Sequence, residues 1–252
     1  MTVWRAVKNS PNIVRQNFVQ CPPLNEQHKQ YRLRFAEEHI GWKHEWSTVS
    51  GPSMFKLRLS IKIIWSDEKR FNLDGPDGFS GYWLDLRSDP RILSKRSFGG
   101  GGCMVWSGFS SIGKLPVVFI RGNMNSEGYQ EVLANFLLPY LEQWAHLEFT
   151  YMQDNAPAHA SRSTRDWLQA HQVPLMEWPP RSPDLNPIEN AWGQLARKVY
   201  ENGRQFESVG QLKDAIRLAW DEIQLSELTA LVNTMPKRLV EVIKKGGGVT
   251  HY

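Results

Sequence analysis

The sequence predicts an α/β fold, in which a mixed β-sheet is flanked by helices, with an N-terminal helical remnant and further helices at the C-terminal end. Short apolar runs such as 61–67 and 149–154 are rich in β-branched and aromatic residues, which favours strands. Longer segments such as 126–144 and 187–200 repeat their apolar residues at helical spacing. Strands and helices that alternate along a chain build a sheet with helices on both faces.

Composition is ordinary for a globular protein. The 252 residues, 41% hydrophobic and 22% charged, suffice for one sizeable domain with an appendage. No apolar run approaches about 18 residues, so no membrane span is expected, and the first residues lack the apolar segment of a signal peptide. Cys21 and Cys103 match neither a metal site nor a disulfide framework, which favours a reducing intracellular compartment.

Charge is distributed unevenly along the chain. The net charge is +4, but residues 1–66 carry ten Lys/Arg against four Asp/Glu, while the remainder carries twenty against twenty-two. A basic front part fits a polyanionic partner such as nucleic acid, although a solvated basic surface would give the same count.

The N-terminal part is predicted to be helical but discontinuous. Residues 2–8 resemble the tail of a helix, and 11–23 are expected to form a linker. Asn25 is a suitable N-cap for a helix that runs to about Ile40. The apolar face of this helix should comprise Tyr31, Phe35, Ala36 and Ile40. Its basic residues are Lys29, Arg32 and Arg34. A loop is expected around Gly51-Pro52.

The central part begins with a strand from Ile61 to Asp67. Turn residues at 72–78 follow, and later a hairpin is expected from 103–109 and 115–120. The next elements, in order, are a helix 126–144 capped by Asn125, a strand ending at Asp154, a helix 158–171, a short strand 173–178 and a helix 187–200. This order is that of an RNase H-like domain.

Two amphipathic helices are expected to close the chain. Ser208 should cap the first and Ser226 the second, with Pro236 inside or at the end of the second helix. The predicted domains are therefore 60–204 for the α/β unit and 205–252 for the C-terminal helical extension.

Three acidic residues in different contexts are the predicted catalytic site. Asp67 and Asp154 end strands, and Glu189 opens the helix that starts at Pro187. Carboxylates so placed can converge on two Mg²⁺ ions roughly 3.5–4 Å apart, which activate an attacking oxygen and stabilise a leaving oxygen. Magnesium prefers oxygen ligands, and Mn²⁺ can replace it. We therefore predict that Asp67, Asp154 and Glu189 are metal ligands for phosphodiester chemistry.

Each acid also has a structural interpretation. Asp67 could simply end a strand, and Glu68 could be the ligand instead, although adjacent strand residues face opposite ways. Asp154 could form an Asx turn. Glu189, at the third position of a helix capped by Asn186, could cap backbone N–H groups.

Other polar residues near these acids are weaker candidates. His159 and Asn155 could orient a ligand or contact phosphate, or could be structural. The run Gly99–Gly102 allows close backbone approach but matches no phosphate-binding loop, and a hinge is the simpler interpretation. Basic residues ahead of this run could contact DNA or lie in a solvated loop; they are Arg91, Lys95 and Arg96.

Three sequence blocks resemble those of one enzyme family. They are Trp65-Ser-Asp-Glu-Lys-Arg-Phe71, Gln153-Asp-Asn-Ala-Pro-Ala-His159 and Arg181-Ser-Pro-Asp-Leu-Asn-Pro-Ile-Glu-Asn-Ala-Trp192. They are similar to the catalytic blocks of mariner-superfamily transposases, and the 34 residues between Asp154 and Glu189 are typical of the worm Tc-element branch. The likeness runs from about residue 61 to the end and more loosely over 2–49.

The resemblance implies cut-and-paste DNA transposition in the nucleus. It implies cleavage at terminal inverted repeats, transfer of the freed 3′-hydroxyl to a TA target, and an Asp-Asp-Glu site made by Asp67, Asp154 and Glu189. It further implies that 72–102 is an insertion that reaches a second subunit, and hence a homodimer on paired DNA ends.

The resemblance also indicates departures from the family pattern. Family members begin with two helix-turn-helix units of roughly fifty residues each. Here residues 1–46 would hold only a remnant of the second unit plus a linker helix, with Arg5 and Lys8 as DNA contacts at the end of a recognition helix. Residues about 50–59 resemble an insertion. Two alternatives therefore stay open: a transposon relic that binds DNA without cleaving it, and an RNase H-like nuclease unconnected to transposition.

Overall fold

The computed structural model describes residues 22–42, 46, 62–75 and 101–252. Several predicted features lie outside these residues. They are the loop around Gly51-Pro52, the proposed insertion at 50–59, Cys21, and the candidate DNA contacts Arg5, Lys8, Arg91, Lys95 and Arg96.

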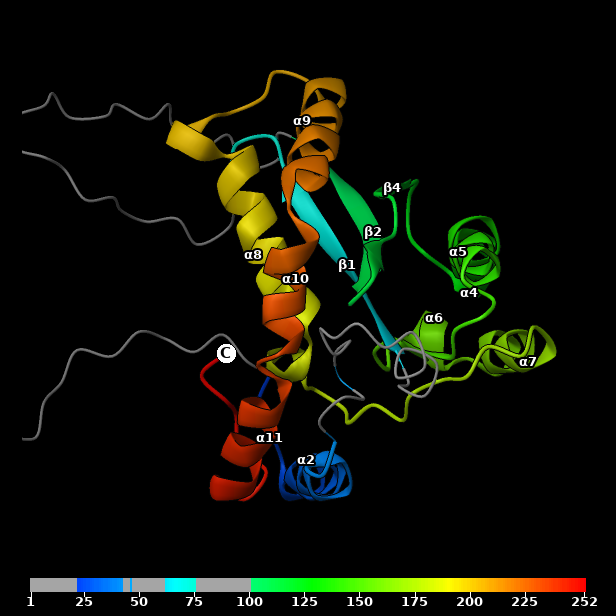
Figure 1. The fold of residues 1–252 in the computed structure, drawn as a ribbon. Coiled ribbons are helices and arrows are strands. Elements are labelled where there is room, and N and C mark those ends of the chain that lie inside the picture. The colour runs from blue at the N-terminus through cyan, green and yellow to red at the C-terminus, as the bar shows by residue number, and fades with distance from the viewer. Residues whose placement is uncertain (1–21, 43–45, 47–61, 76–100) are drawn as a thin grey trace, which may run out of the picture.

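A mixed five-stranded sheet lies at the centre of the described structure (Figure 1), as predicted. Its strands are β1 (Lys62–Asn72), β2 (Gly102–Ser110), β3 (Gly113–Lys114), β4 (Val118–Ile120) and β5 (Phe149–Met152). The order is β3-β2-β1-β5, and β4 also pairs with β2. Strand β1 is antiparallel to β2 and parallel to β5, so the two strands that carry the first two acidic blocks are neighbours.

Two strand predictions were wrong in detail. Asp67 does not end its strand, because β1 continues to Asn72 and Asp67 pairs with Ser107 of β2. The sequence does not predict this continuation, because the residues after Asp67 are charged and show no apolar pattern. The strand there is held by backbone pairing with β2. The predicted strand 173–178 is reduced to one bridge between Tyr151 and Leu175.

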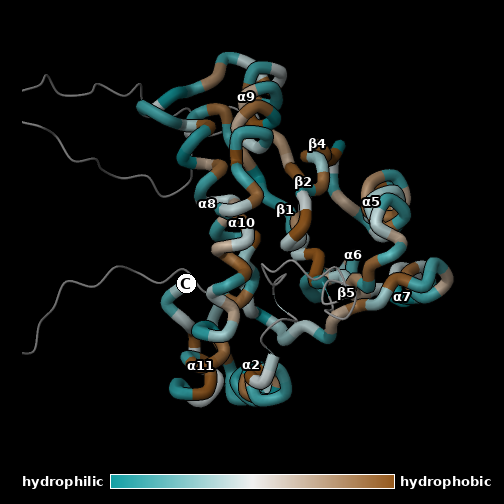
Figure 2. Tube along the Cα trace, viewed as in Figure 1, coloured by the Kyte–Doolittle hydropathy of each residue, from teal (hydrophilic) through white to brown (hydrophobic). Residues whose placement is uncertain are grey.

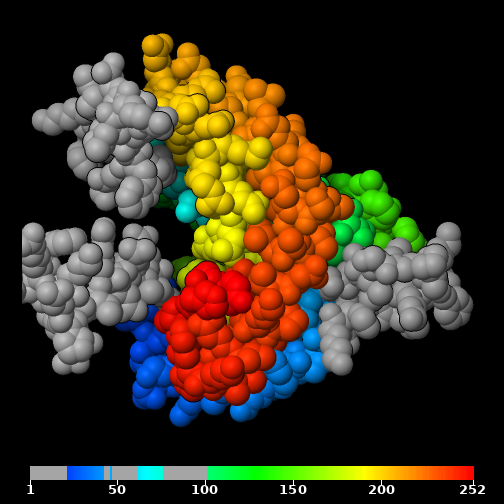
Figure 3. Space-filling view, turned by 60° about the vertical axis from the view of Figure 1, so that its left-hand side comes forward, coloured from blue at the N-terminus to red at the C-terminus, as the bar shows by residue number. Residues whose placement is uncertain are grey.

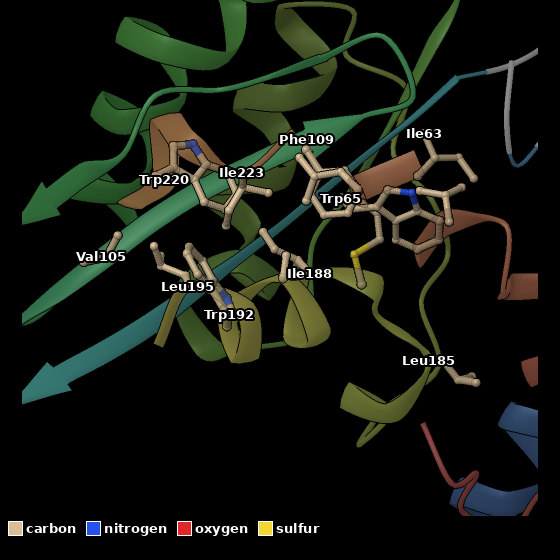
Figure 4. Packing of buried hydrophobic residues seen from close by; sticks show 14 of the residues in the cluster. Ile63, Trp65, Val105, Phe109, Leu185, Ile188, Trp192, Leu195, Trp220 and Ile223 are labelled. Carbon is tan, nitrogen blue, oxygen red and sulfur yellow. The ribbon is translucent and has the colours of Figure 1, made fainter. Parts of the chain in front are cut away.

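Alternation along β1 divides the interior into two hydrophobic cores. Ile63 and Trp65 pack on one face with residues of the C-terminal helices, whereas Ile64 packs on the other face with the helices that follow β4. In Figure 4, Trp65 and Phe109 of the sheet lie next to Ile188, which comes from the helix drawn below them. This alternation decides which face each polar residue after Trp65 reaches.

One face of the sheet is covered by the helices between β4 and residue 170 (Figure 1). They are α4 (Ser126–Val132), a π-helical turn (Leu133–Leu137), α5 (Leu138–Gln143), α6 (Pro157–Ala160) and α7 (Arg162–Ala170). Asn125 caps α4, as predicted, by accepting a hydrogen bond from Gly128 N. The predicted helix 158–171 is broken at Ser161, whose extended backbone ends α6 and whose Oγ caps α7 through Thr164 N.

The other face is covered by α8 (Pro187–Val199), α9 (Val209–Glu222) and α10 (Leu225–Val232), and α11 (Met235–Lys244) continues beyond the sheet. Brown and teal residues alternate along these helices in Figure 2, as one apolar face requires. Ser208 caps α9 as predicted. The predicted cap Ser226 is wrong: the cap lies two residues earlier, at Gln224, in a capping box with Glu227.

Pro236 lies in the first turn of α11 and so opens a new helix, where its missing N–H costs nothing. Helix α11 ends in a Schellman motif: Gly246 N bonds to Ile243 O and Gly247 N to Val242 O, with Gly246 in the left-handed region at φ 55°.

Helix α2 (Glu26–His39) packs beside α11 (Figure 1). Asn25 caps it as predicted, accepting from His28 N at 2.8 Å. Its buried face differs from the prediction, because Tyr31 and Ile40 are exposed and the basic Arg32 is buried with Phe35 and Ala36. No helix in the described ranges has both the length and the apolar character to cross a bilayer.

Candidate active site

Asp67 lies in the middle of β1 and faces α8. It shares its side of the strand with Trp65, two residues earlier, and its Oδ2 accepts a 3.0 Å hydrogen bond from Nε1 of Trp192. The indole thus positions one carboxylate oxygen. Trp192 follows Glu189 by three residues, so both lie on the same side of α8.

Glu189 lies in the first turn of α8, and this turn is attached to β1. Asn186 caps the helix through Ile188 N at 3.3 Å, and its Nδ2 donates to Ser66 O at 3.2 Å. Within the described residues the Glu189 carboxylate makes no capping bond, since the amide of Asn186 donates to Pro183 O instead. The capping interpretation of Glu189 therefore finds no support, and its oxygens stay available.

Asp154 lies two residues after β5, at the edge of the sheet next to β1. Its Oδ1 accepts from Ala156 N at 2.9 Å and lies 2.7 Å from Nδ1 of His159. The Asx-turn bond that the sequence suggests is therefore present. Oδ2 has no hydrogen bond to any described residue, and the side chain is 51% exposed. One oxygen is thus held in place while the other faces solvent.

His159 joins Asp154 to Glu68. The imidazole is buried, with Nε2 3.4 Å from Glu68 Oε1, and its ring is tilted by 32° against that of Tyr129, with 4.0 Å between the ring centroids. Glu68 points away from Asp67, toward the α6 side, as strand alternation requires. Burial alone would lower the pKa of His159, but its contacts with Asp154 and Glu68 and their charges raise it to about 9. The ring is therefore a cation at neutral pH.

The charges of the three acids influence one another. Burial raises the pKa of Asp67 well above its usual value, and the charges of Glu189, Glu68 and Asp154 raise it further. Burial also raises the pKa of Glu189, with Lys69 opposing this effect and Asp154 adding to it. Burial would raise the pKa of Asp154 as well, but the bonds from His159 and Ala156 N outweigh it and the pKa is lowered. Negative charge is therefore unfavourable on Asp67 and Glu189, whereas the contacts of Asp154 stabilise it there.

The chemistry of this neighbourhood fits a hard divalent cation. The available donors are carboxylate oxygens, which Mg²⁺ and Mn²⁺ prefer, and a cation would relieve the repulsion that raises the pKa of Asp67. Among the described residues, buried Oε1 of Glu68 has only the long 3.4 Å approach of His159 and no closer hydrogen-bond partner. In the part of the chain described, however, no group of three or more His, Cys, Asp or Glu side chains is arranged so that it could hold a metal ion. Asp67, Asp154 and Glu189 would hold the ion, but their assignment as ligands stays a prediction.

Buried hydroxyl groups support the site from the α4 side. Tyr129 Oη donates to Gln153 Oε1 at 2.8 Å and lies 2.8 Å from Tyr151 Oη, to which Ser66 Oγ donates at 2.7 Å. This chain joins the residue before Asp67 to the residue before Asp154. It therefore fixes the relative position of β1 and β5 where the acids emerge.

The remaining predicted residues have other contacts. Asn155 donates to Trp178 O at 2.9 Å and bonds to none of the acids, so its predicted role is untested. Gly102 belongs to β2, where a Cβ would lie 2.3 Å from Phe71 O, so close packing and not a hinge explains it. The sequence interpretation missed Trp192 as the partner of Asp67, although its spacing of three residues from Glu189 on one helix was a usable signal.

Comparison with known proteins identifies the family of this chain. Residues 62–213 match the model of the DDE superfamily endonuclease family. The chain is 43% identical over 251 residues to the "Transposable element Tc3 transposase" of Caenorhabditis elegans, a match that covers 100% of this chain and 71% of that protein.

Solved structures match the fold. The "Mos1 transposase paired-end complex with left transposon end" superposes with a TM-score of 0.76 at 18% identity, over 98% of this chain and 70% of that one. The "mariner Mos1 paired end complex with Mg" gives a TM-score of 0.73 at 17% identity, over 98% and 72%.

The fold and the matched family define a nuclease of the DDE superfamily with an RNase H-like sheet. Within that class, the chain belongs to the mariner/Tc family of transposases and holds its catalytic domain. The predicted fold and family are thereby confirmed, and a nuclease unconnected to transposition is excluded.

Proposed function

We propose that this domain cleaves and joins DNA strands with divalent metal ions held by Asp67, Asp154 and Glu189. The observation that carries the proposal is the placement of the three carboxylates. Two come from the adjacent strands β1 and β5, and the third comes from the first turn of α8, which is bonded to β1 next to Asp67 through Asn186 and Trp192. Such a set is costly without a cation and suited to one. The matched Mos1 paired end complex with Mg adds support.

Each protein group has a separate task. Asp67 is aimed by Trp192, and Asp154 is held by His159 and Ala156 N so that its second oxygen faces solvent. Glu189 approaches from the rigid first turn of α8. Bound metal ions would activate water or a 3′-hydroxyl and stabilise the leaving oxygen of the phosphodiester. The contact with His159 lowers the pKa of Asp154 and so favours the carboxylate form that binds an ion.

The partners follow from the family. We propose DNA ending in terminal inverted repeats as the substrate, a TA dinucleotide as the target, and a homodimer on paired DNA ends, within the nucleus. The matched complex of Mos1 with a transposon end supports the DNA partner. The basic residues before position 67 favour electrostatic, salt-sensitive binding to the DNA backbone.

A nicking and joining assay tests the proposal. A duplex with a pre-cleaved end is incubated with Mg²⁺ or Mn²⁺ and with wild type, Asp154→Ala or Asp166→Ala. Asp166 is the matched control, because it is an exposed acid on α7 paired only loosely with Arg162 at 3.7 Å. We expect strand cleavage from wild type and Asp166→Ala and none from Asp154→Ala. Binding of the duplex without metal-dependent cleavage by wild type would instead identify an inactive relic.

A further inference from the structure

A buried ion pair outside the three acids joins distant parts of the chain. The guanidinium of Arg32 on α2 is fully buried and donates to both carboxylate oxygens of Asp184, each at 2.7 Å. Asp184 lies in a 3₁₀ turn, Pro183–Leu185, directly before the cap Asn186 of α8. A forked pair of this kind fixes orientation as well as distance. The turn that leads into α8 is therefore held by a helix from the other end of the chain.

The C-terminal segment completes the surroundings of this pair. The acceptors of Arg32 are Ser182 Oγ, both Asp184 oxygens and the carbonyls of Gly247 and Gly248. All five N–H groups of the guanidinium are thus used. Thr250 N donates to Asp184 Oδ2 at 2.8 Å. In Figure 3 the red C-terminal surface adjoins both the yellow of α8 and the blue of α2.

A second buried guanidinium holds the same turn from α11. Arg238 donates to Asp184 O at 2.7 Å and to Asn190 Oδ1 at 2.6 Å. Asn190 is the neighbour of Glu189 on α8. Arg32 of α2 and Arg238 of α11 therefore both bind Asp184, just before α8, and Arg238 also binds Asn190 in the first turns of α8.

The close approach of α2 to the C-terminal segment shows that this geometry is specific. Gly247 has φ 86°, and a Cβ there would lie 2.1 Å from Lys29 O. Only glycine allows this contact, which places the Gly247 carbonyl within reach of Arg32. A buried ion pair is by itself weak evidence for stability, since apolar residues can replace one without loss. We therefore explain the Arg32–Asp184 pair by the position that it gives to the start of α8 and not by a gain in stability.

We infer that Arg32, Asp184 and Arg238 are positioning residues of the active site, which place the first turn of α8 so that Glu189 can bind metal. This inference rests on the proposed role of Glu189. The link to the other acids is short, because Asn186, two residues after Asp184, donates to the carbonyl next to Asp67. Residues from both ends of the described chain thus act on the site through one turn.

The test compares conservative variants in the full chain. Arg32→Lys keeps the charge but loses the fork, and Asp184→Asn keeps the shape but loses the charge. Arg34→Lys is the matched control, because Arg34 lies on the same helix and pairs with Glu38 in solvent. Hydrogen exchange of the amides in 183–190 reports the turn, Mn²⁺ titration by electron paramagnetic resonance reports metal affinity, and the nicking assay reports activity.

We expect faster exchange at 183–190 and a loss of Mn²⁺ affinity and cleavage of about 10–100-fold in Arg32→Lys and Asp184→Asn, with no change in Arg34→Lys. Deletion of 249–252 retains the Arg32–Asp184 pair but removes the Thr250 bond to Asp184 and the ring of Tyr252 that packs on Arg238. A change in the same direction is therefore expected, and it serves as a second measurement if a point variant unfolds.

Two results would overturn the inference in different ways. If wild type binds Mn²⁺ and cleaves DNA, and the folded variants bind Mn²⁺ as tightly as wild type, the pair is structural only. If wild type neither binds Mn²⁺ nor cleaves, the proposed function is itself wrong and the positioning role is lost with it.

Discussion

Trp192 on α8 donates a 3.0 Å hydrogen bond to Asp67 on β1, and so joins the two elements that carry the first and third acids. The indole ring is fully buried among core residues. A single side chain thus sets both the packing distance of α8 and the orientation of one carboxylate. The core and the active site therefore share a residue.

Replacement of this indole separates its two roles. Trp192→Phe keeps an aromatic ring in the core but removes the N–H donor. We expect cleavage activity to fall about 10–100-fold, because Asp67 loses the contact that orients it. Activity with saturating Mg²⁺ and the thermal midpoint are measured together. Trp144→Phe, at a tryptophan that packs against the other hydrophobic core, is the control and should leave metal dependence unchanged.

Metal ions should stabilise the protein, and neutralising Asp67 should imitate part of their effect. In EDTA, Asp67→Asn is expected to unfold at a higher temperature than wild type, because the amide keeps an acceptor for Trp192 and removes a charge disfavoured by burial and by Glu189. Mg²⁺ at a hundred times its dissociation constant should stabilise wild type by about 2.7 kcal/mol and the variant much less. Equal metal-induced shifts in both proteins would argue against Asp67 as a ligand.

The C-terminal end should make stability depend on pH through Glu241. Its carboxylate binds Lys245 Nζ at 2.6 Å and the backbone N of His251 at 3.1 Å. Burial would raise the pKa of Glu241, but the hydrogen bonds and charges of the Lys245 and His251 side chains outweigh it and the pKa is lowered. Because the folded pKa is below the unfolded value, the stabilisation is complete above the unfolded pKa and is lost as pH falls through the folded pKa.

Urea unfolding between about pH 3 and pH 6 should therefore show a smaller loss of stability on acidification in Glu241→Gln than in wild type. Glu222→Gln is the control, since its pair with Lys198 is exposed and such pairs contribute little. An unchanged acid limb in Glu241→Gln would show that these contacts do not persist in solution.

Two adjacent glycines allow a matched comparison at the end of α11. Gly246 has a left-handed backbone with open space around it, so Gly246→Ala should cost roughly 1–2 kcal/mol of unfolding free energy from backbone strain alone. Gly247→Ala adds a collision with Lys29 O and should cost clearly more. Chemical denaturation measures both. Similar losses in the two variants would mean that α2 does not approach the C-terminal segment closely.

Most elements are predictable from the sequence because their signals are local. Each of four caps is evident from one residue and the pattern behind it, and each accepts the expected backbone N–H; they are Asn25, Asn125, Asn186 and Ser208. Ser226 misleads, because a serine just inside the helix looks like a cap when a glutamine already fills that place.

What depends on distant partners could not be predicted. In the sequence, Arg32 looks like an ordinary solvated basic residue of a helix. Its buried partner Asp184 lies 152 residues away, so no local pattern reveals that Arg32 is buried. Asp67 appears in the sequence to end its strand for the same reason, since the pairing of β1 continues with β2 far along the chain. The sequence blocks single out the three acids as candidates, whereas the partners of Asp67 and Asp154 became evident only from the fold.

The connection between β1 and β2 begins and ends at neighbouring positions of the sheet. Asn72 pairs with Gly102, and Leu73 N bonds to Gly101 O at 3.2 Å, so the ends of the connection are pinned together whatever lies between them. Closing a loop costs only about 0.6 kcal/mol more for each doubling of its length. Changes in the length of this connection should therefore cost little free energy of folding. The pairing of β1 with β2 should persist even if a tight turn replaces the connection.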